Sequence, residues 1–167
     1  MATVTQVLAP EEAQFKTTVF PQYQRFQGTN FPVSGLAYDA TADEAASWKL
    51  VATRYGSGNL TLSLKWYADT ASSGVVRWEC QIAAVTPNTD TQDVETDGLA
   101  TAQTVDDTHL GTTGQRLHEA SITVSNLDSL AADDVVWLRI ARLGSHANDT
   151  MTGDAVLTLA TLAYSDT

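Results

Sequence analysis

Two adjacent segments with strict apolar and polar alternation constrain the fold of this chain more than any other feature. In residues 60–68 and 75–85 every second side chain is apolar, which is the period of a strand with one buried face. The apolar faces comprise Leu60, Leu62, Leu64 and Trp66 in the first segment and Val76, Trp78, Cys80 and Ile82 in the second. The turn-rich residues 69–74 between them predict a hairpin at the centre of an antiparallel sandwich, which sets the register of the other strands.

Further segments of strand length and composition follow on either side of this pair. They are residues 33–38, 46–53, 99–105, 117–124, 134–143 and 155–164. The connections are rich in Gly, Asp, Asn and Thr, and no helical period is sustained. About eight strands in this arrangement predict an all-β fold, an antiparallel jelly-roll β-sandwich or a related Greek-key sandwich. Apolar groups on both faces of the last two strands indicate that the N-terminal segment or a partner subunit covers the outside of one sheet.

The first 32 residues differ from the rest, because their aromatic side chains follow neither a helical nor a strand period. Pro10 and the acidic residues after it predict a short helical turn. We therefore divide the chain into an extended N-terminal arm, residues 1–32, and a jelly-roll β-sandwich domain, residues 33–167. We expect the arm to contact another subunit through its aromatic side chains, which are Phe15, Phe20, Tyr23, Phe26 and Phe31.

Charge and cysteine content narrow the classes of partner. Nine Lys and Arg against 20 Asp and Glu give a formal net charge of −11, which disfavours binding to nucleic acid. No stretch approaches the roughly 18 apolar residues of a membrane span, and no charged start precedes an apolar run, so we expect no membrane partner and synthesis in the cytoplasm. The single cysteine, Cys80, precludes an internal disulfide, and its place on a strand predicts burial.

No catalytic constellation is visible in the sequence, and we predict no catalytic residues, no cofactor and no metal. The acids of the 86–98 loop, Asp90, Asp93, Glu95 and Asp97, carry oxygen ligands but miss the spacing of a calcium loop. His146, Asp149 and Asp154 lie in ordinary turn sequences, which favours a structural role. Trp48 and Trp137 are the tryptophans left as candidates for stacking on a sugar, since Trp66 and Trp78 follow the core alternation.

Several ordered segments resemble a jelly-roll family common in the virions of tailed phages. The resemblance spans about residues 33–164 and rests on GLAYDA (35–40), EAASW (44–48), LTLSLKWYA (60–68), GVVRW (74–78), LRIAR (138–142) and DTMTGDA (149–155). Members of this type are similar to capsid decoration (cement) proteins and to fibre or tail-spike modules. The resemblance implies a non-enzymatic protein, typically trimeric and without a cofactor.

This resemblance leads to a principal hypothesis and two alternatives. The first is a capsid decoration protein on the virion surface, a homotrimer whose arm binds the major capsid protein and stabilises the head lattice. The second is a tail-fibre or receptor-binding module that recognises a host surface glycan, for which exposed Trp or Tyr in one loop cluster is the distinguishing feature. A carbohydrate-active enzyme is the third, and it requires two facing carboxylates in a cleft.

Overall fold

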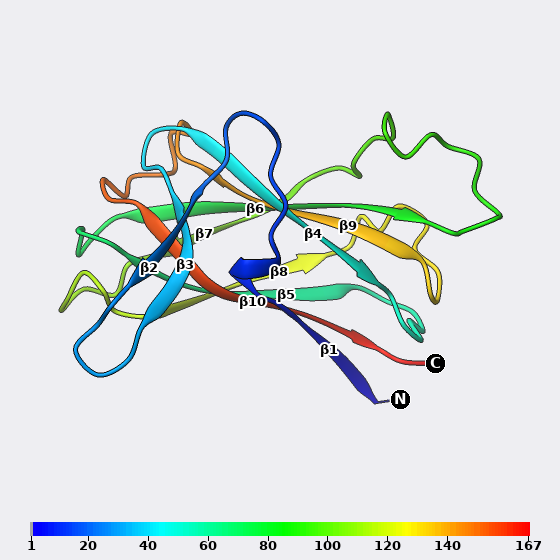
Figure 1. The fold of residues 1–167 in the computed structure, drawn as a ribbon, viewed down its shortest axis with the longest axis horizontal. Coiled ribbons are helices and arrows are strands. Elements are labelled where there is room, and N and C mark those ends of the chain that lie inside the picture. The colour runs from blue at the N-terminus through cyan, green and yellow to red at the C-terminus, as the bar shows by residue number, and fades with distance from the viewer. Residues whose placement is uncertain (1) are drawn as a thin grey trace.

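The computed structural model describes residues 2–167, which form ten strands and one short 3-10 helix (Figure 1). The N-terminal elements are β1 (Thr3–Leu8), η1 (Pro10–Glu12), β2 (Gln22–Phe26), β3 (Val33–Tyr38) and β4 (Asp43–Val51). The others are β5 (Leu60–Ala68), β6 (Val75–Val85), β7 (Gln103–Thr108), β8 (His118–Val124), β9 (Val135–Leu143) and β10 (Ala155–Ser165). Nothing helical in the described chain has the length and apolar character needed to cross a membrane.

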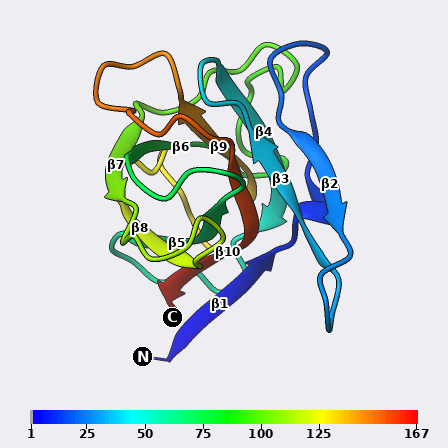
Figure 2. The same cartoon turned by 90° about the vertical axis from the view of Figure 1, so that its left-hand side faces the viewer.

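The strands form two antiparallel sheets that pack face to face, which confirms the predicted jelly-roll β-sandwich. The larger sheet has six strands in the order β2-β3-β10-β5-β8, with β1 paired to β10, and the smaller has the order β4-β9-β6-β7. Figure 2 shows the two layers from the end of the sandwich. The core lies between them, and its largest members include Trp48, Trp66 and Trp78.

The predicted alternation of β5 and β6 is confirmed, but the predicted hairpin is wrong. All eight side chains assigned to the apolar faces are at most 1% exposed. However, β5 pairs with β8 and β10, whereas β6 pairs with β7 and β9, so the two strands belong to different sheets. Residues 69–74 carry the chain from one sheet to the other. Two strands with matching apolar faces bury them equally well by facing each other across the core, and that is the arrangement here.

The N-terminal segment is part of the sandwich, which raises the number of strands from the predicted eight to ten. β1 pairs with β10 and β2 pairs with β3. Between them the chain follows the edge of β4, where Gln14 bridges to Ser47. The alternation of β1 was hidden because Gln6 takes an inward position, where its amide donates to the Tyr164 hydroxyl at 2.7 Å. The predicted helical turn is confirmed as η1.

Two predicted strands are displaced along the chain. β4 begins at Asp43 rather than at residue 46, and β7 occupies Gln103–Thr108 rather than residues 99–105. The sequence did not indicate a strand beyond residue 105, because Asp106 and Asp107 follow and aspartate is uncommon in strands. The structure satisfies both acids: Asp106 forms an ion pair with Arg77 at 2.6 Å, and Asp107 accepts a hydrogen bond from Trp66 Nε1 at 2.7 Å.

Candidate ligand-binding groove

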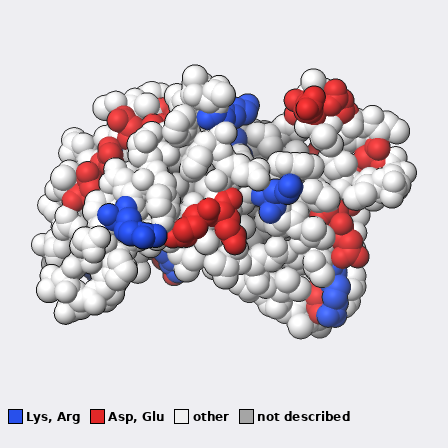
Figure 3. Space-filling model, viewed as in Figure 1, with Lys and Arg blue, Asp and Glu red and all other residues white. Residues whose placement is uncertain are grey.

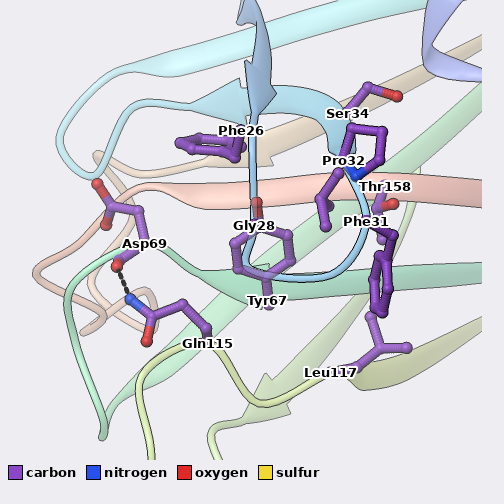
Figure 4. Close-up of a pocket in the computed structure, with 11 residues that line it drawn as sticks. Phe26, Gly28, Phe31, Pro32, Ser34, Tyr67, Asp69, Gln115, Leu117 and Thr158 are labelled. Atoms are coloured by element: carbon purple, nitrogen blue, oxygen red, sulfur yellow. Dashed lines mark hydrogen bonds between the residues drawn. The ribbon is translucent and has the colours of Figure 1, made fainter.

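A groove of about 700 Å³ lies on the outer face of the six-stranded sheet, where the β2–β3 loop stands over β5 and β10 (Figure 4). Its size is in the range of ordinary ligand sites, roughly 300 to 1,000 Å³. The lining residues are Phe26, Gly28, Phe31, Pro32, Val33, Ser34, Tyr67, Asp69, Gln115, Leu117 and Thr158. They come from four separate parts of the chain, so the tertiary structure creates the groove.

A small apolar cluster on the outer face of the sheet adjoins the groove and contributes Tyr67 to its lining. Ala37, Val156 and Tyr67 lie directly opposite one another on β3, β10 and β5 and form a cluster separate from the main core. Phe26 packs its ring against Tyr67 at an edge-on angle, with ring centroids 6.3 Å apart. Because Trp66 points into the core, the next residue, Tyr67, must point outwards. The β5 alternation therefore places an aromatic ring beneath the groove.

An irregularity in β10 positions Thr158 in the groove. The pairing of β10 with β5 shifts between Leu157 and Leu159, which leaves Thr158 as an extra residue. On the opposite edge of β10, β3 pairs as far as Leu157 and β1 begins at Ala160. On this edge of β10 the partner strand changes from β3 to β1 around Thr158. The side chain of Thr158 lines the groove.

One wall is the loop between β2 and β3, which carries Phe31. Phe31 is 70% exposed, so most of its ring is accessible from the groove. The loop turns at Gly28, where φ is +57°, and a Cβ built there would lie 2.2 Å from the Phe31 carbonyl oxygen. Glycine is required at this position both by the left-handed conformation and by the close approach of the backbone. The turn thus determines where Phe31 is presented.

The opposite wall comes from the loop between β7 and β8, which supplies Gln115 and Leu117. Figure 4 shows the side chain of Gln115 pointing to Asp69, whose main-chain carbonyl accepts a hydrogen bond from the Gln115 amide nitrogen. Leu117 is 59% exposed and faces Phe31 in the same view. The two exposed apolar side chains mark the rim, and the polar side chains of Asp69 and Gln115 lie together at one end.

The groove combines aromatic surface with a few polar groups. Burial raises the pKa of the Tyr67 hydroxyl, and the charge of Asp69 adds to the effect, so Tyr67 stays a neutral donor and acceptor at physiological pH. Among the described residues that line the groove, Asp69 supplies the only carboxylate. Hydrolysis of a glycosidic bond ordinarily uses two facing carboxylates, and the described lining of the groove supplies one.

The five aromatic residues predicted as contacts of the arm occupy three different settings. Phe26 and Phe31 line the groove. Phe15 and Phe20 pack against each other with ring centroids 5.5 Å apart. The Tyr23 hydroxyl donates to Glu11 Oε1 at 3.1 Å. Contact of these residues with another subunit or a capsid stays a prediction.

Sequence reasoning missed the other half of the groove. Tyr67 carried a usable signal, because it is an aromatic side chain on the outward face of a predicted strand. Asp69, Gln115 and Leu117 lie in connecting segments of ordinary composition, and Thr158 depends on a strand irregularity. Nothing in the linear sequence indicated that these segments meet.

The tryptophans left as candidates for sugar stacking do not form the site. Trp48 is 2% exposed, and its Nε1 donates to the Ala9 carbonyl at 2.8 Å, so the N-terminal segment covers it. Trp48 is therefore not a surface residue, because a segment that could not be placed from the sequence covers it. Trp137 is half-buried in β9 of the other sheet. The aromatic surface of the groove is supplied instead by Phe and Tyr.

The remaining chemical candidates lie elsewhere. Figure 3 shows acidic side chains spread over the visible surface, with a group on the loop between β6 and β7 that projects from the sandwich in Figure 1. This loop carries the exposed residues Asp90, Asp93, Glu95 and Asp97. Within residues 2–167 no group of three or more His, Cys, Asp or Glu side chains is arranged to hold a metal ion.

Comparison with known proteins identifies the fold but no family. No family model matches the sequence, and no curated protein matches it. Among solved structures, a carbohydrate-binding module specific for non-crystalline cellulose, CBM28, shares the fold with a TM-score of 0.52, at 9% identity over 89% of this chain and 85% of that one. A family 11 carbohydrate-binding module from Clostridium thermocellum, in complex with a β-1,3-1,4-mixed-linked tetrasaccharide, gives a TM-score of 0.47 at 11% identity, over 96% and 87% of the two chains.

Proposed function

We propose that this chain is a non-catalytic glycan-binding module whose groove on the outer face of the six-stranded sheet holds a segment of a saccharide. The observation that carries the proposal is the grouping of Phe26, Phe31 and Tyr67 around one groove, with the polar groups of Asp69 and Gln115 at its end. The sequence set exposed Trp or Tyr in one loop cluster as the mark of a glycan-binding module, and the groove differs from it: its exposed ring is Phe31, and Tyr67 is 9% exposed on β5.

The chemistry of the groove suits a sugar. A pyranose presents apolar C–H faces and a rim of hydroxyl groups, so it needs flat apolar surface together with hydrogen-bond donors and acceptors. Phe31 and Tyr67 provide the surface, and the side chains of Asp69, Gln115 and Thr158 provide polar partners. A site of this kind, mostly apolar with a few polar groups that fix orientation, is the usual form of a small-ligand site.

The shared fold guides the choice of ligands for a test, although it shows architecture alone. The CBM28 module with the same fold is specific for non-crystalline cellulose, which makes soluble β-glucans the first saccharides to try. Host surface glycans follow, because recognition of such a glycan by a tail fibre was the alternative that the sequence supported. The single carboxylate in the groove supports a non-enzymatic role.

Native gel electrophoresis in the presence of soluble polysaccharides tests the proposal. The panel contains a cellulose derivative, a mixed-linkage β-glucan, a mannan and polysaccharide purified from host cells. Retardation by at least one of them is expected. Phe31→Ala weakens binding by about fivefold, which corresponds to roughly 1 kcal/mol for one aromatic contact.

Phe15→Ala is the matched control, since Phe15 is also a partly exposed aromatic residue of the N-terminal segment but lies outside the groove. We expect it to bind as the unmodified chain does. Equal weakening by both substitutions, or no retardation by any polysaccharide, contradicts the proposal.

The capsid decoration role, with a homotrimer and the major capsid protein as partners, remains a separate prediction. Light scattering tests the trimer, which has three times the chain mass of 17.9 kDa. Co-sedimentation with expanded and unexpanded empty heads tests the capsid contact. Saturable binding to expanded heads that Phe15→Ala weakens would support it, and binding to neither form would contradict it.

A further inference from the structure

Two buried histidines lie under the loop that forms one wall of the groove. His109 and His118 are 6% and 4% exposed, and their ring centroids are 4.4 Å apart. His118 also stacks on Trp66, with centroids 4.7 Å apart and planes inclined by 23°. The two histidines flank residues 110–117, the connection between β7 and β8 that carries Gln115 and Leu117 into the groove.

Both rings hold the loop by accepting hydrogen bonds from its backbone. The Leu110 N–H donates to His118 Nε2 at 2.9 Å, and the Gly111 N–H donates to His109 Nδ1 at 2.9 Å. On its other side, His109 Nε2 lies 3.0 Å from the Gly114 carbonyl oxygen, to which it donates. A ring nitrogen that accepts a hydrogen bond carries no proton, so this arrangement requires both imidazoles to be neutral.

Protonation of either ring removes the acceptor that this ring offers to the loop. An imidazolium has N–H groups at both ring nitrogens, so two donors would face each other at Leu110 and at Gly111. Two positive rings 4.4 Å apart would also repel each other in a buried setting. Burial, and then the neighbouring His109, lower the pKa of His118, which agrees with a folded state that favours the neutral ring.

The charged groups that face the pair act in opposite directions. Asp107 of β7, which accepts a hydrogen bond from Trp66, favours protonation of His118, whereas Arg116 of the loop opposes it. Asp69, on the neighbouring loop, meets the 110–117 loop through its main-chain carbonyl and Gln115. The charges of Asp107 and Arg116 oppose each other. Two protonated rings would therefore have no excess negative charge nearby to balance them.

Other charges on the adjoining strands point away from the histidines. Lys65 and Glu119 form an ion pair on the outer face of the large sheet, 2.5 Å apart. Arg77 and Asp106 form another on the outer face of the small sheet. Neither pair faces the imidazoles, so their effect on the loop is small.

We propose that His109 and His118 are positioning residues that form a pH-sensitive latch, holding the 110–117 loop against the groove when neutral and releasing it, with loss of saccharide affinity, when protonated. The second half of this inference rests on the proposed glycan-binding function. The loop half concerns the free protein alone. Release would displace Gln115 and Leu117 together, which removes one wall of the groove.

Hydrogen exchange in the free, full-length chain tests the loop half. Exchange is followed by NMR at about pH 7.5 and about pH 4.5, the lower value well below the ordinary histidine pKa because burial lowers the pKa of His118. After correction for the intrinsic pH dependence, the protection factors of the Leu110 and Gly111 amides are expected to fall by about tenfold or more. The Ala52 amide, bonded to the Asp134 carbonyl at 2.9 Å, is the internal reference and is expected to keep its protection.

The coupling to saccharide affinity is tested with a polysaccharide that binds in the electrophoresis experiment. We expect the Kd to rise by about tenfold or more on acidification in the unmodified chain. The double variant His109→Gln, His118→Gln keeps oxygen acceptors that do not titrate, so its Kd changes by less than about twofold. His146→Gln removes an exposed histidine outside the site and is expected to behave as the unmodified chain.

The outcomes separate the two proposals. If the protection factors of the Leu110 and Gly111 amides do not change between the two pH values, the latch proposal is wrong. This measurement uses the unmodified chain, so this conclusion about the latch holds even if the double variant folds poorly. Reduced protection with unchanged affinity overturns its coupling to the groove, as does equal pH dependence in the double variant. Absence of binding at both pH values contradicts the glycan proposal and the ligand half of the latch, while reduced protection would still support the loop half.

Discussion

Arg142 and Asp149 form an ion pair in which both side chains are completely buried. The guanidinium of Arg142 binds the carboxylate through two hydrogen bonds, Nε to Oδ2 at 3.0 Å and a terminal nitrogen to Oδ1 at 2.8 Å. Its remaining donors reach the main-chain carbonyls of Tyr38, Met151 and Gly153. The pair thereby ties the β9–β10 connection to β3 and to the end of β9. The turn residues 145–154, which the sequence assigned a structural role, are held by this contact.

Asp149→Asn is expected to destabilise the protein strongly, because it leaves the Arg142 charge buried without its counter-charge. Removing one partner of a buried pair costs about 3 to 5 kcal/mol, which lowers the melting temperature by roughly 6 to 20 °C in a domain of this size. Glu119→Gln is the control, since it removes one charge of the exposed Lys65–Glu119 pair, where solvent screens the attraction, and it should change the stability little. Thermal unfolding measures both, and equal effects would contradict the assignment.

Glu44→Gln is expected to stabilise the protein more at neutral pH than in acid. Burial raises the pKa of Glu44, and the charges of Asp39 and Asp154 add to that effect. The folded state therefore binds more protons than the unfolded chain, and the contribution of this carboxyl is full below its ordinary pKa of about 4.3 and declines as the pH rises. The Gln carbonyl retains the hydrogen bond from the Asp39 N–H, which measures 2.8 Å to Glu44 Oε2.

Urea unfolding of the Glu44→Gln variant and the unmodified chain at about pH 4 and about pH 7 tests this prediction. The free energy of unfolding of the variant should exceed that of the unmodified chain by a larger margin at the higher pH. A margin that shrinks with rising pH would show that Glu44 is better accommodated as a carboxylate than burial and its neighbours indicate.

Gly28→Ala is expected to disturb the groove beyond the ordinary cost of a left-handed alanine. That cost is about 1 kcal/mol or somewhat more. Gly58→Ala is the matched control, because Gly58 also has a positive φ, +85°, but nothing lies within 4 Å of an added Cβ. At Gly28 the added Cβ meets the Phe31 carbonyl oxygen, so the backbone must move. The free energy of unfolding, measured in denaturant, and the saccharide affinity should both fall further in Gly28→Ala than in Gly58→Ala. Equal losses in the two variants would show that the loop adjusts freely.

Cys80 is expected to be inert in the folded protein. It is 0% exposed, and burial raises the pKa of its thiol to about 12, so the thiolate that reacts with disulfide reagents is scarce at neutral pH. Modification by a chromogenic disulfide reagent should therefore follow unfolding, slow in buffer and fast in denaturant. Rapid reaction of the native protein would show that β6 opens locally.

Trp66 and Trp78 illustrate how far sequence reasoning reaches in this fold. Both were assigned to buried strand faces from alternation alone, and both are 0% exposed. Their ring centroids lie 6.2 Å apart with planes inclined by 62°, because they face each other across the core from different sheets. Alternation specifies which face of a strand is buried but not whether two such strands pair side by side or pack face to face.

The N-terminal segment shows a second limit. β1 and β2 lack a clear apolar period, because β1 places Gln6 at an inward position and β2 is an edge strand whose side chains are mostly exposed. Only their pairing with β10 and β3 reveals them as strands. The groove depends on the same step, because Phe31 enters it on a loop whose place is determined by the pairing of β2 with β3.

The sequence by itself determined the all-β class, the buried faces of the central strands and the abundance of aromatic residues near the N-terminus. These are local properties, written in a period of two along each strand. The tertiary structure decided which sheet each strand joins, and so which loops meet above Tyr67 and which carboxylate, Asp69, lies beside them. The physical reason is that strand pairing and loop placement depend on contacts between residues far apart in the chain, which local alternation does not encode.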